Sequence, residues 1–132
     1  MHADLLAQRV VGLIEGATFP HLDAASVVGV IALLLAGAGL VTVRDYALGG
    51  GDLLPLLVAE PLPRAEASIG IVPALGGVTD EVLRQLSRQA QHPAVDGLVV
   101  VGAGAFPTPL PRRVGGVPLR LAVVGARTNQ AT

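Results

Sequence analysis

The chain has 132 residues, of which 52% are hydrophobic, 14% are charged and 2% are aromatic, and its formal net charge is −1 at pH 7. This length predicts one domain over residues 1–132, and the lack of a basic patch and of aromatic platforms disfavours a nucleic-acid partner. The sequence has no Cys and no Lys, which excludes disulfides, thiolate nucleophiles, Cys-bound zinc, Schiff bases and a P-loop lysine.

The amino-terminal segment predicts a short helical lead-in over residues 3–8 and a first strand over residues 10–14, where apolar residues form a compact run. A single helix over 3–16 would carry apolar residues on every side, which disfavours that alternative. A loop containing Pro20 follows. No basic region with an apolar core and a cleavage site is present, so the expected location is cytoplasmic.

The longest stretch without a charge covers residues 24–43. About 20 uncharged residues can cross a bilayer as one helix, so a single-span membrane protein is one interpretation. We favour another, in which a helix capped by Asp23 continues to Ala36, the Gly-Ala-Gly segment 37–39 ends it, and residues 40–43 form a buried parallel strand. The absence of Trp at either edge also disfavours a membrane span.

The next region is interrupted by glycine and proline. Residues 49–51 predict a flexible break, and residues 52–58 predict a short helix or an irregular packed segment. Three prolines disfavour any long regular element here: Pro55, Pro61 and Pro63. A third strand is expected over residues 68–72.

The second half of the chain has a clearer pattern. A loop over 73–78 leads to a helix with Thr79 as its N-cap, acidic residues in its first turn and apolar residues at helical spacing. The apolar run 98–101 predicts a central parallel strand, and residues 119–124 predict the last strand. Three prolines predict an extended connection between these strands: Pro107, Pro109 and Pro111. The polar tail 127–132 is expected to be frayed.

Strands that alternate with helices or loops predict an α/β fold: a Rossmann-like, open, mostly parallel sheet of about five strands with flanking helices in three layers. Ligands of such sheets bind beyond the carboxyl ends of the strands. The best candidate site combines Gly76, Gly77 and Thr79, because glycines let a ligand approach the backbone and the amides of the next helix point at an anion. The alternative is a terminus that Asp80 and Glu81 already neutralise.

Three other residues could bind a cofactor. Gly102 and Gly104 form half of a dinucleotide-binding fingerprint after a strand. Asp45 lies at the end of the second predicted strand, where nucleotide-binding α/β proteins have an acidic residue that hydrogen-bonds the ribose. A turn and a solvated carboxylate explain the same residues without a cofactor. No serine has a neighbouring base and the three histidines are far apart, so we expect no catalytic residue, no metal site and no cofactor.

Three segments carry a resemblance to a known family: Arg9-Val-Val-Gly-Leu-Ile-Glu-Gly16, Ala32-Leu-Leu-Leu-Ala-Gly-Ala-Gly39 and Val41-Thr-Val-Arg-Asp45. Together they resemble the opening βαβ unit of the ThiF-like adenylyltransferases. The resemblance implies a nucleotide loop at 16–22, which keeps only the first glycine, and the family's Lys and Cys pairs are absent. It therefore implies a degenerate copy that adenylates nothing. Residues 69–127 are also similar to the smaller domain of bacterial asparaginases.

The leading hypothesis is a non-catalytic α/β module that binds a protein partner or a second copy of itself, because so apolar a chain has little polar material to cover its surface. One alternative is a small enzyme or ligand-binding domain that uses the helix terminus at 76–80 for an anionic group. A single-span membrane protein through residues 24–43 is the other.

Overall fold

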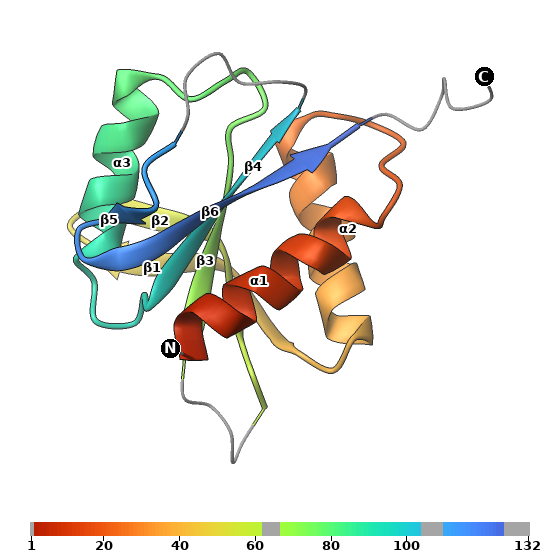
Figure 1. Cartoon of the computed structure of the whole chain (residues 1–132), viewed down its shortest axis with the longest axis horizontal. Coiled ribbons are helices and arrows are strands. Elements are labelled where there is room, and N and C mark those ends of the chain that lie inside the picture. The colour runs from red at the N-terminus through yellow and green to blue at the C-terminus, as the bar shows by residue number, and fades with distance from the viewer. Residues whose placement is uncertain (1, 62–66, 104–109, 126–132) are drawn as a thin grey trace.

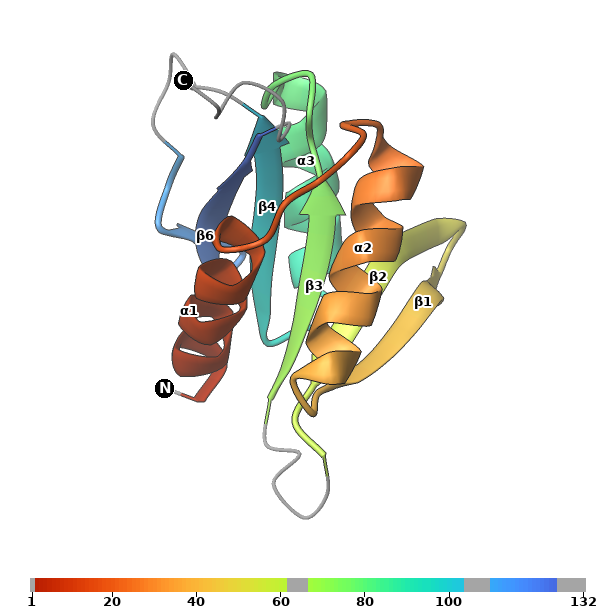
Figure 2. The ribbon, with the colours of Figure 1, turned by 90° about the vertical axis from the view of Figure 1, so that its right-hand side faces the viewer.

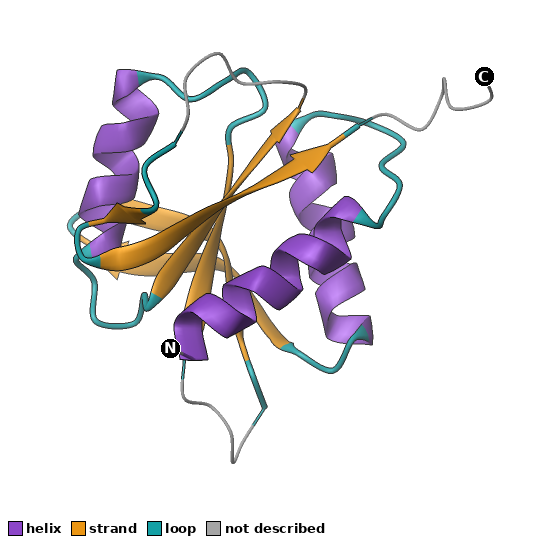
Figure 3. Ribbon diagram, in the orientation of Figure 1, coloured by secondary structure: helices purple, strands orange, loops and turns teal. Residues whose placement is uncertain are grey.

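The computed structural model describes residues 2–61, 67–103 and 110–125, and the strands among them form one six-stranded sheet in the order β1-β2-β3-β4-β6-β5 (Figure 1). The elements, which Figure 3 colours by type, are α1 (His2–Glu15), α2 (Ala24–Gly37), β1 (Val41–Gly49), β2 (Asp52–Ala59), β3 (Ser68–Pro73), α3 (Asp80–Ala90), β4 (Gly97–Ala103), β5 (Arg113–Val114) and β6 (Val117–Val124).

The sheet lies between two helical layers. Helices α1 and α2 cover one face and α3 covers the other, as Figure 2 shows. The central strand β4 contributes to both cores: Val99 and Val101 pack on the side of α1 and α2, and Leu98 and Val100 pack on the side of α3. This alternation explains why β4 is a continuous apolar run, because a strand buried on both faces needs apolar residues at every position.

The prediction of a Rossmann-like, mostly parallel sheet is wrong. Among the described strands, β3–β4 and β4–β6 pair in parallel, whereas β1–β2, β2–β3 and β5–β6 pair antiparallel. Strands β1, β2 and β3 neighbour one another in chain order, so they need none of the crossovers that a parallel sheet requires. The architecture is a mixed α/β fold.

The predicted first strand over residues 10–14 is also wrong, because this segment belongs to α1. Its Leu6, Val10 and Ile14 are buried at helical spacing against β6 and its neighbours. Leu5, on another side of the helix, stays 63% exposed. Apolar residues on several sides therefore did not prevent a helix, since one buried stripe was enough to fix it.

The helix predicted inside residues 24–43 is confirmed as α2, but the strand after it is not buried. The Ser26 N–H donates to the Asp23 carboxylate at 3.0 Å, which confirms the N-cap, and Gly39 has the positive φ (88°) expected of the turn. The next strand, β1, is the outermost strand of the sheet, and Val41 is 48% exposed there. No described helix is long and apolar enough to cross a membrane.

Residues 52–58 are neither a helix nor irregular, because they lie in the strand β2. Pro55 lies between Leu54 and Leu56, which pair with Tyr46 and Arg44, and the register pairs neither Pro55 nor Asp45 with a partner. Asp45 has a φ of 53°, which is unusual for a residue other than glycine. Leu54 and Leu56 are two residues apart, so in a regular strand they would face the same side of the sheet. In β2 they pack in the cores on opposite faces of the sheet, which shows that the alternation of the strand is interrupted around Pro55.

The other predicted elements are confirmed. Strands occur over 68–72, 98–101 and 119–124, and Thr79 caps α3. Several predictions fall outside the described residues, namely those on Pro63, Pro107, Pro109 and the tail 127–132.

Candidate functional site

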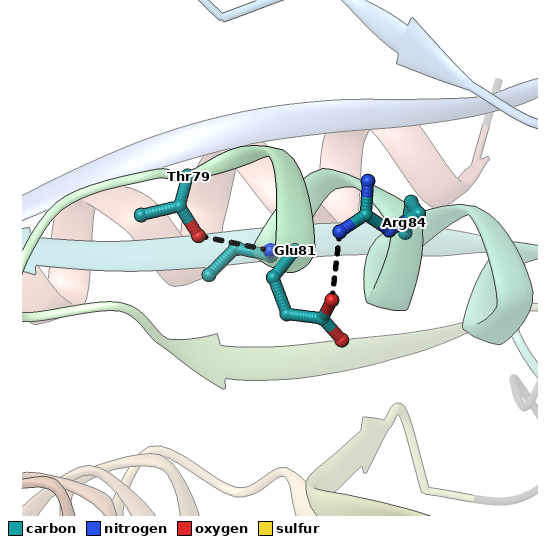
Figure 4. Close-up of polar contacts among 4 residues, drawn as sticks. Thr79, Glu81 and Arg84 are labelled. Carbon is teal, nitrogen blue, oxygen red and sulfur yellow. Dashed lines mark hydrogen bonds and ion pairs between the residues drawn. The ribbon is translucent and has the colours of Figure 1, made fainter.

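The loop predicted to bind an anion connects β3 to α3, at the carboxyl end of the parallel strands. The Thr79 hydroxyl accepts a hydrogen bond from the Val82 N–H at 3.2 Å, and the Glu81 carboxylate accepts one from Arg84 at 2.9 Å (Figure 4). That bond from Arg84 lowers the pKa of Glu81. The amino terminus of α3 thus already has a capping acceptor and a carboxylate, as expected if Asp80 and Glu81 neutralise it. The binding of an anionic ligand at this terminus stays a prediction.

The remaining predicted cofactor residues are distributed over the sheet. Gly76 and Gly77 lie in the loop after β3, and Gly102 is buried near the end of the neighbouring strand β4. Asp45 lies inside β1, and both β2 and β3 separate that strand from β4. Gly104 lies outside the described residues. The structure therefore does not bring Asp45 together with the glycines.

One cavity of about 660 Å³ lies between the first turn of α1 and the hairpin formed by β5 and β6. We call it the arginine cavity, and it is lined by Asp4, Arg112, Arg113, Pro118, Leu119 and Arg120. The hairpin register pairs Arg113 with Pro118. Arg120 follows two positions after Pro118, so the three side chains share the sheet face on which α1 packs.

An ion pair fixes one wall of the arginine cavity. Both carboxylate oxygens of Asp4 accept hydrogen bonds from the Arg120 guanidinium, at 2.9 and 3.1 Å. These bonds lower the pKa of Asp4 and raise that of Arg120. On the hairpin, Arg113 donates to the Gly116 carbonyl at 2.6 Å. Arg112 makes no side-chain hydrogen bond or ion pair with a described residue.

A second feature is an apolar surface over α2 and the outer edge of β1. A groove of about 560 Å³ lies there, and its walls include Gly29, Leu33, Ala36, Thr42 and Arg44. We call this groove the α2–β1 surface. His21 also lines the groove. Among the described residues, no three His, Asp or Glu side chains gather as a metal site would require.

Neither feature was found from the sequence. The pair Arg112-Arg113 was visible, but its approach to Asp4 depends on the β5–β6 hairpin and on α1, which was predicted as a strand. Residues 40–43 were predicted as a buried strand, so an exposed surface that includes Thr42 was not expected. A glycine in mid-helix, Gly29, was the available signal for a close external contact.

In comparisons with known proteins, no family model matches the chain, and neither a curated protein nor a solved structure matches it significantly. The resemblance to the ThiF-like family thus stays a prediction, and function must be inferred from the geometry of these surfaces.

Proposed function

We propose that the protein is a non-catalytic binding module that associates with a second copy of itself through the α2–β1 surface. The observation that carries this proposal is the exposure of Leu33, which is 78% accessible in the middle of a helix whose opposite side is buried. Burying a leucine side chain is worth about 1.5–3 kcal/mol, so a leucine left in water favours a contact that covers it. Val41 and Val43 are also 48% and 43% exposed, but they alternate along β1 with Thr42 and Arg44 and therefore face the other side of the sheet.

Gly29 gives independent support. A glycine inside a helix costs about 1 kcal/mol relative to alanine. A Cβ added at Gly29 would meet no atom within 4 Å, so the packing of the chain does not require glycine here. Gly29 lies one helical turn from Leu33 on the same groove. Glycine at this position is explained by the close approach of a second helix.

The outer edge of β1 can provide backbone hydrogen bonds to a second copy. Strand β1 has nine residues and pairs with β2 along one side, so its other side carries N–H and C=O groups that no described strand satisfies. Antiparallel pairing of two β1 edges would form one continuous sheet. Exposed edges of this length are usually covered or blunted, which favours such an occupant.

A two-fold axis perpendicular to the sheet satisfies the side chains as well. It keeps both α2 helices on the same sheet face, so Leu33 of each copy approaches the groove of the other at Gly29 and Ala36. The surface is thus complementary to itself in shape, because Leu33 of each copy enters the groove of the other, and this favours a second copy over an unrelated partner. The expectation of a cytoplasmic location is kept as part of this proposal.

Sedimentation velocity over a concentration series tests the proposal. We expect the wild-type protein to change from monomer to dimer with increasing concentration, and Leu33→Glu to remain monomeric at the highest concentration. Because Leu33 is exposed and Glu is a good helix former, the variant should melt within a few degrees of the wild-type monomer.

The matched control is Leu5→Glu, which changes an exposed leucine of α1 outside the α2–β1 surface. It should dimerise like the wild type. A wild-type protein that stays monomeric at several hundred micromolar would overturn the proposal, as would a Leu33→Glu variant that dimerises normally.

A further inference from the structure

The arginine cavity concentrates positive charge in a chain that is negative overall. The chain contains nine Arg and Lys residues, all arginine, and three of them line this cavity with one carboxylate. The lining residues therefore carry a net charge of +2, against −1 for the whole chain. Arginines that line one cavity repel one another, so this concentration of positive charge favours an anionic ligand.

The carboxylate in the cavity does not neutralise all three arginines. Asp4 directs both oxygens to Arg120, at 2.9 and 3.1 Å. Arg113 is held by a neutral acceptor, the Gly116 carbonyl. Among the described residues, neither Arg113 nor Arg112 has an ion-pair partner. Within the described part of the chain, two arginines of the cavity lining thus have no counter-charge.

The volume and the chemistry of the lining define a class of ligand. A cavity of about 660 Å³ falls within the roughly 300–1,000 Å³ typical of small-molecule sites and is larger than a single ion needs. Guanidinium groups match the oxygens of phosphate and carboxylate in pairs, with charge-assisted hydrogen bonds. The uncompensated charge of two favours a ligand that carries at least two negative charges.

We propose that the arginine cavity binds a small organic polyanion that presents phosphate or carboxylate groups to Arg112 and Arg113. Asp4 positions the third arginine, Arg120, in the wall by engaging two of its three donor nitrogens, Nε and Nη2. The cavity adjoins β5 and β6 at one edge of the sheet, and the α2–β1 surface lies at the other. The site is therefore independent of self-association, and a dimer leaves it accessible.

Isothermal titration calorimetry with the full chain tests this inference, using pyrophosphate, citrate and acetate as probes at constant ionic strength. We expect saturable binding of one pyrophosphate or citrate per chain and no saturation with acetate. The tighter of the two polyanions identifies phosphate or carboxylate as the preferred group. The absence of saturable binding with both polyanions at millimolar concentration would overturn the proposal.

Arg112→Gln is the informative variant, because the Arg112 side chain supports no described contact, whereas its backbone carbonyl accepts from Leu119 and is retained. It should weaken polyanion binding at least tenfold, the effect of losing a charge-assisted hydrogen bond. Arg84→Gln makes the same change of charge on α3, away from the cavity, and should bind like the wild type. If both variants weaken polyanion binding equally, the anions respond only to the net charge of the protein, and the arginine cavity is not the binding site.

Discussion

At the scale of single residues, one polar side chain of the described chain lies in the core, and the sequence pattern did not reveal it. Gln89 of α3 is 1% exposed, and its Oε1 accepts no hydrogen bond from the described residues. In the sequence it occupies one of many polar positions of an amphipathic helix. Only the packing of α3 against β4 and β5 shows that this position is turned inward.

A buried acceptor without a hydrogen bond lowers the free energy of unfolding. Removing Gln89 Oε1 therefore tests whether this side chain is packed in the core as described. Gln89→Met keeps the length of the side chain and removes the acceptor, so the free energy of unfolding should stay equal or rise by about 1–3 kcal/mol. Chemical denaturation measures the change. Gln85→Met, at a partly exposed position of the same helix, should change stability by less than about 0.5 kcal/mol. A clear loss of stability in Gln89→Met would mean that Oε1 has a partner.

At the scale of elements, two helical glycines distinguish internal packing from an external contact. An added Cβ would meet no atom within 4 Å at Gly12 of α1 or at Gly29 of α2. Both Gly12→Ala and Gly29→Ala should therefore stabilise the monomer by about 0.5–1 kcal/mol in urea unfolding.

The two variants should differ in self-association. Gly29→Ala inserts a methyl group where we expect the second α2 helix, so its dimer dissociation constant should rise at least tenfold in sedimentation experiments. Gly12→Ala lies outside the α2–β1 surface and should dimerise like the wild type. Unchanged dimerisation of Gly29→Ala would place the contact elsewhere.

The elements that could be predicted are those whose signals are local. Thr79 with acidic residues after it determines where α3 begins, and the uninterrupted apolar run of β4 reflects burial on both faces. The failures concern properties set by distant segments. Residues 10–14 are apolar enough for a strand or a helix, and only the packing of α1 on β6 decides between them. Pro55 disfavours a strand in isolation, but in β2 it stands at a position that the register with β1 leaves unpaired.

The candidate sites were less predictable than the fold for the same reason. The loop at 76–79 was found because glycine and capping residues are adjacent in sequence. The arginine cavity combines Asp4 with Arg120, which are 116 residues apart, and depends on a hairpin whose first strand has two residues. The α2–β1 surface is exposed because β1 is at an edge, and strand order is a property of the whole sheet.

At the scale of the whole molecule, one ion pair connects the two ends of the described chain. Asp4 in α1 and Arg120 in β6 are partly exposed, at 48% and 36% of their side chains, and the carboxylate binds the guanidinium through both oxygens. The hydrogen bonds from Arg120 hold the pKa of Asp4 below its ordinary value of 3.8. A carboxyl group with a lowered pKa stabilises the folded state above its unfolded pKa, and this stabilisation is lost as pH falls through the folded pKa.

Asp4→Asn should therefore be less stable than the wild type at pH 7, and the difference in melting temperature should shrink toward zero as the pH is lowered below the folded pKa of Asp4. Thermal unfolding at steps from neutral to strongly acidic pH measures this difference. Glu81→Gln removes an ion pair within α3 whose side chains are more exposed, 69% for Glu81 and 65% for Arg84. This variant should also melt below the wild type at pH 7, but the difference in melting temperature should be smaller than for Asp4→Asn. A difference for Asp4→Asn that does not change with pH would show that the residue acts through helix packing, and that the ion pair between α1 and β6 does not stabilise the fold.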